Sequence, residues 1–161
     1  MQPTGPAPLG CGKHPVSAAL LLYEPRDVKS RGVEFEATGR VGKDSKLTLG
    51  LTRLKLTGPD GADIYEWVPR TTANLRYDTL VMPKWRAGFS ARWQSEASKN
   101  PGARQGAYLL AHAFAAYEFS PAATLRLNVD NLFDKKYVGG LAYGAIYGAP
   151  RNAAIPLDYK L

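Results

Sequence analysis

The sequence contains one cysteine and two histidines among its 161 residues. Because Cys11 is alone, an internal disulfide and a CxxC metal pair are both excluded. His14 and His112 are far apart and have no cysteine or acidic residue at ligand spacing. No serine or cysteine lies in a nucleophile-elbow pattern, and no glycine run continues into the GK[ST] of a phosphate loop. We therefore predict no catalytic residues, no metal site and no cofactor.

Long apolar runs are also missing. No stretch of 18 or more apolar residues occurs, which excludes a transmembrane helix. The hydrophobic share of 45% and the mean hydropathy of -0.28 are typical of a soluble protein. They are equally typical of a transmembrane barrel, in which half of each strand faces water or a polar lumen.

A secretory signal is not visible near the N-terminus. The first basic residue is Lys13, and the apolar run at 18–22 is too short. The first 16 residues are rich in proline and glycine and show no periodicity. We predict that residues 1–22 are a disordered leader, that residues 18–24 include at most a short strand, and that the chain is a truncated piece of a longer protein.

The formal net charge is +7, yet the lysines and arginines are spread singly along the chain. No basic cluster is interleaved with aromatics, as a nucleic-acid-binding module would require. We therefore predict no nucleic-acid partner.

Apolar and polar residues alternate through most of the chain with a period of two, which predicts strands with two unlike faces. In 46–57 the apolar phase moves from Leu47, Leu49 and Leu51 to Leu54 and Leu56. This shift indicates either a bulge or the end of an apolar zone. The alanine content of 107–119 also fits a helix, but its place between two loop signals favours a strand. The predicted strands are 31–42, 46–57, 71–80, 85–96, 107–119, 124–130 and 151–161.

Two features of this pattern indicate a bilayer. Trp85 and Trp93 share one strand face, and their separation is roughly 20 Å along a barrel axis, close to the spacing of two aromatic belts. The connections also alternate in length, as the short periplasmic turns and long extracellular loops of outer-membrane barrels do. The short ones are 43–45, 81–84 and 120–123; the long ones are 58–70, 97–106 and 135–150.

Three motifs carry a family resemblance. Asn131-Leu132-Phe133-Asp134-Lys135-Lys136-Tyr137 is followed by Gly148-Ala149-Pro150-Arg151-Asn152 and a terminal alternating strand, and Arg31-Gly32-Val33-Glu34-Phe35-Glu36 opens an earlier strand. From about Tyr23 to Leu161 the sequence resembles the C-terminal part of TonB-dependent outer-membrane receptors, the siderophore-receptor branch in particular. The family usually ends in phenylalanine, whereas this chain ends in Leu161 and has Pro156 inside its last strand.

The resemblance implies an all-β fold: an antiparallel up-and-down meander of seven or eight strands, a fragment of a 22-stranded transmembrane β-barrel over residues 23–161. It implies a ferric siderophore as ligand, outer-membrane lipid as surroundings, and a TonB complex that acts through an N-terminal region absent here. The fragment alone is then not transport-competent. Two alternatives stay open: a stand-alone small outer-membrane barrel with a structural or adhesive role, and a soluble ligand-binding barrel with an apolar interior. An enzyme is the weakest alternative.

The resemblance also suggests which loop residues meet a ligand. Aromatic loops at a barrel mouth could stack on a catecholate or planar chelate, and arginines could pair with an anionic ferric complex. The opposing interpretation is that these aromatics pack loop against loop. The candidates are Tyr65, Trp67, Arg70, Arg104, Tyr137, Tyr143 and Tyr147.

A second set of residues, in the motifs that carry the resemblance, is assigned a structural role. The glycines of the same loop are expected to relieve crowding among its tyrosines. Here the Arg151 guanidinium is expected to hold the Asp134 carboxylate across the hairpin, and His112 is expected to face the lumen. The set comprises Asn131, Phe133, Asp134, Tyr137, Gly148, Pro150 and Arg151.

Overall fold

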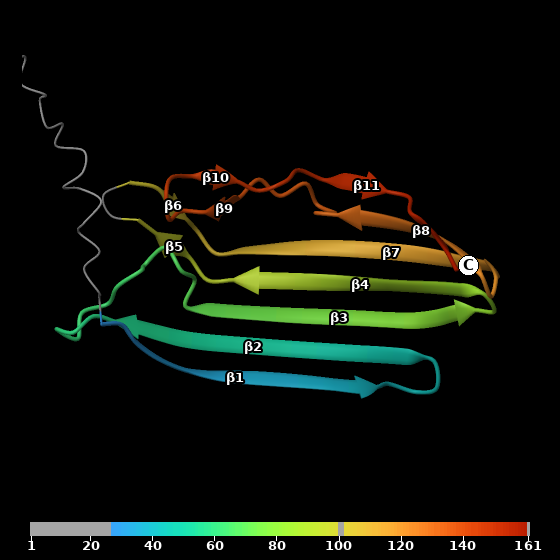
Figure 1. Ribbon diagram of the computed structural model, residues 1–161, viewed down its shortest axis with the longest axis horizontal. Helices are drawn as coiled ribbons and strands as arrows, with labels where there is room; N and C mark the ends of the chain where they lie inside the picture. The colour runs from blue at the N-terminus through green and yellow to red at the C-terminus, as the bar shows by residue number, and fades with distance from the viewer. Residues whose placement is uncertain (1–26, 100–101, 161) are drawn as a thin grey trace, which may run out of the picture.

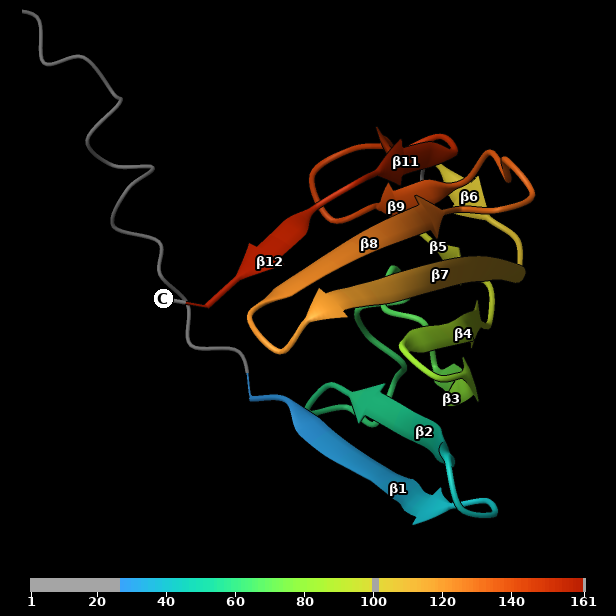
Figure 2. The same cartoon turned by 90° about the vertical axis from the view of Figure 1, so that its right-hand side faces the viewer.

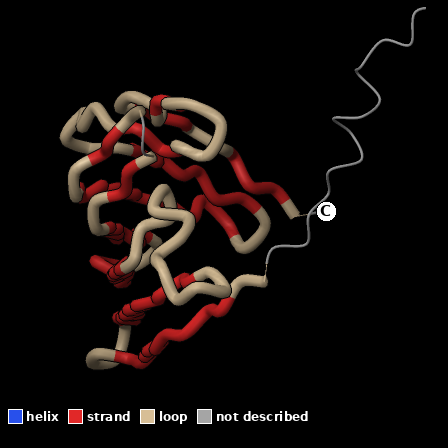
Figure 3. Tube along the Cα trace, turned by 90° about the vertical axis from the view of Figure 1, so that its left-hand side faces the viewer, coloured by secondary structure: helices blue, strands red, loops and turns tan. Residues whose placement is uncertain are grey.

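A computed structural model describes residues 27–99 and 102–160, and the predicted leader and the strand within 18–24 lie outside them. Strands and loops make up this part of the chain (Figure 3). It contains no apolar helix of membrane-spanning length. The long strands are β1 (Lys29–Arg40), β2 (Ser45–Thr57), β3 (Thr71–Met82), β4 (Trp85–Gln94), β7 (Tyr108–Ser120) and β8 (Ala123–Asp130).

These strands form one antiparallel sheet in which neighbours in sequence are mostly neighbours in space. The order is β1-β2-β3-β4-β7-β8-β11, and β12 also pairs with β8 (Figure 1). β11 (Asn152–Ala154) and β12 (Leu157–Tyr159) are two parts of the predicted last strand. The sheet curves into an open arc with β1 at one end and β12 at the other (Figure 2). The predicted all-β antiparallel meander of seven or eight strands is confirmed.

The two faces of the sheet differ as the alternation predicts. One row of paired residues runs from Phe35 through Leu51, Ala73 and Trp93 to Leu109. Phe35 is 59% exposed, and the described residues include no large side chain that is fully buried. The apolar side chains therefore cover an outer surface instead of filling a core. The apolar interior that a soluble ligand-binding barrel requires is not found in the described sheet.

The polar face is the crowded one. A Cβ added to Gly50 would lie 2.6 Å from the Asn74 side chain, and one added to Gly88 would overlap the Phe114 ring. Gly50 and Gly88 both belong to polar-face rows of the register. Such crowding is expected on the inner side of a curved sheet, so the polar face is concave and the apolar face is convex.

β2 contains no bulge at the predicted phase shift. Its register with β1 is continuous from Lys46 to Thr57, and its pairing with β3 runs unbroken to Arg53. The bulge interpretation is therefore wrong, and the alternation itself never changes. Beyond Leu51 the apolar face carries Arg53 and Lys55 instead of leucines, which fits the other interpretation, the end of the apolar zone.

The alanine-rich segment forms β7, as the sequence analysis favoured. Both of its neighbours, β4 and β8, supply ladder partners along its length. Interstrand pairing on both sides overrides a local preference for helix. His112 lies on the polar face, as expected, since Ala111 and Ala113 occupy the apolar rows.

Pro156 interrupts the last strand without displacing it. Ala154 pairs with Asn128 and Leu157 with Leu125, so the register is the same on both sides. The proline has no N–H to donate, but its carbonyl accepts a hydrogen bond from the Arg126 N–H at 3.0 Å. The interruption costs one ladder bond and leaves the strand in place.

Short turns gather at one end of the sheet and long loops at the other (Figure 1). The turn predicted at 81–84 is shorter than expected because β3 continues to Met82. The long connections contain two small hairpins that the sequence analysis did not predict. These are β5 (Ala97–Ser98) with β6 (Arg104–Gln105), and β9 (Val138–Gly140) with β10 (Ile146–Tyr147).

Candidate functional site: the long-loop end and the polar face

The first long loop, 58–70, carries three of the predicted contact residues. Tyr65 and Trp67 pack edge to face with ring centroids 4.9 Å apart. Tyr65 has a φ of 54°, an unusual value for a residue with a side chain. The two rings therefore form a local aromatic pair, which agrees with the loop-packing interpretation and leaves their role in ligand contact a prediction.

Arg70 is occupied by its own loop. Its Nη2 donates to the Ile64 carbonyl at 2.7 Å, and its Nη1 is covered and has no hydrogen-bond partner among the described residues. Arg104, in the second loop, forms an ion pair with Glu96. The hydrogen bond from Arg104 to Glu96 raises the pKa of the guanidinium, which therefore keeps its charge. Both arginines have partners within the loops, and their pairing with an anionic ligand is untested.

Lys99 connects the three long loops. Its ammonium lies 5.9 Å from the centroid of the Trp67 ring in the first loop. The same ammonium donates to the Ala142 carbonyl in the third loop. The Ser98 N–H also donates to the Glu66 carbonyl at 3.0 Å. Sequence analysis did not single out Lys99, since one lysine in a polar loop has no distinguishing pattern.

The third loop contains one packed tyrosine and two exposed ones. Tyr137 packs on Tyr108 with centroids 4.8 Å apart. A Cβ at Gly148 would overlap the Tyr137 ring, so glycine does relieve crowding at that position. Tyr143 is 99% exposed and Tyr147 is 78% exposed. Of the predicted contact tyrosines, these two are free to meet a ligand.

Asn131 holds the start of this loop. It is only 3% exposed and has a φ of 48°. Its Nδ2 donates to the carbonyls of Lys135 and Ala149 at 2.9 and 3.0 Å, and its Oδ1 accepts from the Lys135 N–H at 2.9 Å. The side chain thus ties the loop's beginning to its end, which supports the structural role assigned to this motif.

The expected contact between Arg151 and Asp134 exists, but through different atoms. The Arg151 backbone N–H, not the guanidinium, donates to the Asp134 Oδ1 at 2.9 Å. Asp134 has a φ of 50°, which brings its short carboxylate close to the backbone at the start of β11. The predicted guanidinium bridge is therefore corrected to a backbone contact. Phe133, from the same motif, is 73% exposed.

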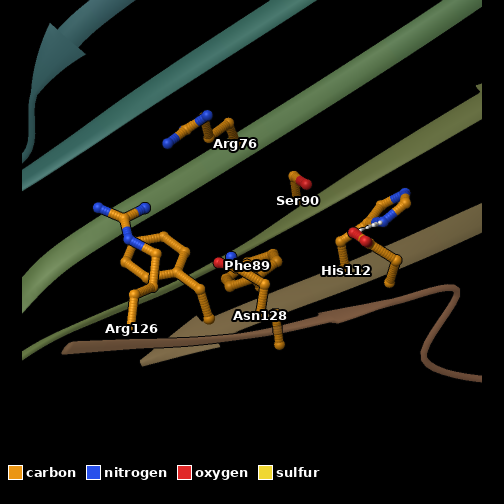
Figure 4. A pocket seen from close by; sticks show the side chains of 9 residues that line it. Arg76, Phe89, Ser90, His112, Arg126 and Asn128 are labelled. Atoms are coloured by element: carbon orange, nitrogen blue, oxygen red, sulfur yellow. Dashed lines mark hydrogen bonds and ion pairs between the residues drawn. The ribbon is translucent and has the colours of Figure 1, made fainter. Parts of the chain in front are cut away.

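The polar face holds a hollow of about 370 Å³ across β3, β4, β7 and β8 (Figure 4). His112 Nδ1 and Asp130 Oδ1 are 2.9 Å apart on one side of it. On the other side, the Arg126 guanidinium lies 4.8 Å from the centroid of the Phe114 ring, with Arg76 opposite in Figure 4. Sequence analysis missed this group because it depends on the register of four strands, which alternation alone does not supply.

Residues 2–132 match the family described as TonB dependent receptor-like, beta-barrel. The chain belongs to this TonB-dependent receptor family. The match begins inside the predicted leader, whose boundary at residue 22 remains a prediction. It ends within the Asn131 motif.

Curated relatives of this TonB-dependent receptor chain include two pyoverdine receptors. The ferric-pyoverdine 358 receptor of Pseudomonas putida is 31% identical over 157 residues, which cover 90% of this chain and 19% of the relative. The ferripyoverdine receptor of Pseudomonas aeruginosa is 28% identical over 150 residues, with coverages of 84% and 18%. The chain thus spans about one fifth of the length of these relatives.

Solved structures give the same result for the fold. The ferripyoverdine receptor of the outer membrane of P. aeruginosa, bound to ferripyoverdine, superposes with a TM-score of 0.72 at 26% identity, covering 83% of this chain and 20% of that one. The ferric-catecholate import receptor Fiu of Escherichia coli K12 superposes with a TM-score of 0.72 at 21% identity, with coverages of 83% and 21%. The described sheet is therefore a barrel segment of this receptor fold, and the barrel is not closed within it.

Proposed function

We propose that the chain forms part of an outer-membrane receptor that takes up a ferric siderophore with energy supplied through TonB. The observation that carries the proposal is the sheet with an exposed apolar convex face and a polar concave face, capped at one end by connected long loops. This inverted distribution is the one that a bilayer-spanning barrel requires. The relatives named as pyoverdine receptors support ferric pyoverdine as the probe to try first.

Ligand contact is proposed at the exposed tip of the third loop. Tyr143 and Tyr147 present ring faces to solvent, and aromatic rings stack on planar chelates. Lys99 and the Asn131 hydrogen bonds hold the loop that carries them against its neighbours. Of the remaining aromatic candidates, Tyr65 and Trp67 pack on each other and Tyr137 packs on Tyr108, so their rings have partners within the protein.

The test is a titration of the purified receptor that contains this chain with ferric pyoverdine, followed by the quenching of the protein's tryptophan fluorescence. Tyr143→Ala/Tyr147→Ala should weaken binding by about tenfold or more, since stacking contributes of order 1 kcal/mol per ring. Tyr159→Ala is the matched control, because Tyr159 is also exposed, at 66%, but lies in β12 at the short-turn end. Unchanged affinity in the double variant would remove this loop tip from the binding site.

A further inference from the structure

Three basic side chains interrupt the apolar face where β1 and β2 approach the long loops. Arg31 pairs with Lys55 in the register, and Arg53 pairs with Val33. Alternation places all three on the face that carries Phe35 and Leu51. Each is exposed. We call Arg31, Arg53 and Lys55 the basic rim.

The basic rim borders a shallow hollow of about 550 Å³, which Asp63 and Arg70 also line. Four of the five charged residues in its lining are therefore basic. The one acidic group, Asp63, lies 3.8 Å from Lys55, and both side chains are more than half exposed, so this ion pair is weak. Arg31 and Arg53 have no side-chain ion pair among the residues that the structure describes. The hollow carries an uncompensated positive charge.

The position of the basic rim along the strands indicates which kind of ligand its positive charge contacts. Arg53 follows Leu51 by two residues, about 7 Å along the strand. If the apolar face lies in hydrocarbon, the rim is at the height of the lipid headgroups, where long basic side chains can extend their charges to the polar layer. At the opposite end of the same face, Trp85 and Tyr117 pack with centroids 4.8 Å apart.

We propose that the basic rim binds the phosphate groups of anionic lipid headgroups in the leaflet beside the long loops. The proposal rests on the membrane placement given under the proposed function, but not on the identity of the siderophore. Arg31 and Arg53 supply two guanidinium groups that have no carboxylate partner within 27–99 and 102–160, and their planar donors suit phosphate oxygens. Lys55 adds a third charge, which Asp63 partly offsets.

The test uses the protein purified in a neutral detergent and titrated with mixed micelles, with native mass spectrometry to count the retained lipid. Dioleoyl phosphatidic acid, dioleoyl phosphatidylcholine and inorganic phosphate are the three probes. We expect phosphatidic acid to bind at least tenfold more tightly than phosphatidylcholine, and inorganic phosphate at the same concentration not to displace it. Equal retention of the two lipids would overturn the proposal, as would displacement by inorganic phosphate, which would identify a site for soluble anions.

Two substitutions then locate the site. Arg31→Gln/Arg53→Gln should weaken phosphatidic acid binding by about 25-fold, from about fivefold per basic residue near an anionic surface. The matched control is Arg40→Gln/Lys46→Gln, which removes a register-paired basic couple from the same two strands on the polar face. The control should stay within about twofold of the parent protein. An equal loss in both double variants would show that net charge, not the rim, attracts the lipid.

Asp63→Asn gives a change of opposite sign, which misfolding cannot imitate. Removing the carboxylate beside Lys55 should tighten phosphatidic acid binding by up to about fivefold and leave phosphatidylcholine unchanged. Weaker binding of phosphatidic acid in this variant would contradict the proposal, because the rim would then need Asp63 for its structure instead of being opposed by its charge.

Discussion

Two residues, Asn131 and Gly148, fix the conformation of the third loop. Asn131 is buried and makes three hydrogen bonds to the two ends of the loop. Gly148 leaves the space that the Tyr137 ring fills. Neither residue could hold a ligand itself. Both determine where the exposed tyrosines of the loop tip are placed.

Asn131→Ala should destabilise this loop by about 1–3 kcal/mol, because the carbonyls of Lys135 and Ala149 and the Lys135 N–H lose their partner. Hydrogen exchange of the backbone amides in 135–150 measures the loss as faster exchange. Asn152→Ala is the control, since Asn152 is exposed and its side chain makes one long bond of 3.3 Å. Comparable exchange in the two variants would show that the loop does not depend on Asn131.

Gly148→Ala should displace Tyr137 from Tyr108, because the added methyl group overlaps the Tyr137 ring. The near-ultraviolet circular dichroism of the packed tyrosine pair should weaken. Gly106→Ala is the matched control, since a Cβ there has no atom within 4 Å. In a Tyr137→Ala background, where the ring is already gone, Gly148→Ala should cost no further thermal stability, and a further loss there would place the strain in the backbone instead of the ring.

The main strands could be predicted from alternation because one face is apolar, which fixes both the element and its side. The 107–119 segment shows the limit of this method, since its alanines left helix open until both neighbouring ladders were known. The two loop hairpins could not be predicted because β5, β6, β9 and β10 have two or three residues each, too few to show a period. The hydrogen bonds of Asn131 and Lys99 join residues far apart in sequence, and no local pattern encodes them.

The three long loops are connected into one unit by Lys99, which faces Trp67 and donates to the Ala142 carbonyl. Lys99→Met keeps much of the side-chain length and removes the charge. We expect faster hydrogen exchange in both 62–68 and 138–147, because the first and third loops each lose their contact with the Lys99 ammonium of the second loop. Lys43→Met, in a short turn at the other end of the sheet, should leave both segments unchanged. Faster exchange in only one segment would contradict a shared connection.

At the scale of the whole molecule, the distribution of apolar residues is the reverse of a water-soluble fold. Leu49 lies near the middle of the convex face, in a row with Ala37, Leu75 and Ala91. Thr48 is its neighbour in sequence and projects from the polar face, where its Oγ1 lies 2.9 Å from the Oγ1 of Thr38. Substitutions at Leu49 and Thr48 therefore compare the two faces of the sheet at the same place in one strand.

Leu49→Arg should therefore cost about 2–4 kcal/mol of stability in a bilayer, the cost of an arginine on a lipid face at the midplane. Thr48→Arg should cost less, because its guanidinium stays in water on the polar face, where the like charge of its register partner Arg76 adds at most about 1 kcal/mol. Urea titration of the complete receptor barrel that contains this chain, refolded into phosphatidylcholine vesicles, measures both values under the same conditions. In neutral detergent micelles, where the apolar layer can deform around a charge, the difference should shrink. If the two variants lose equal stability in vesicles, the convex face does not contact lipid, and the membrane-spanning assignment of this sheet fails with it.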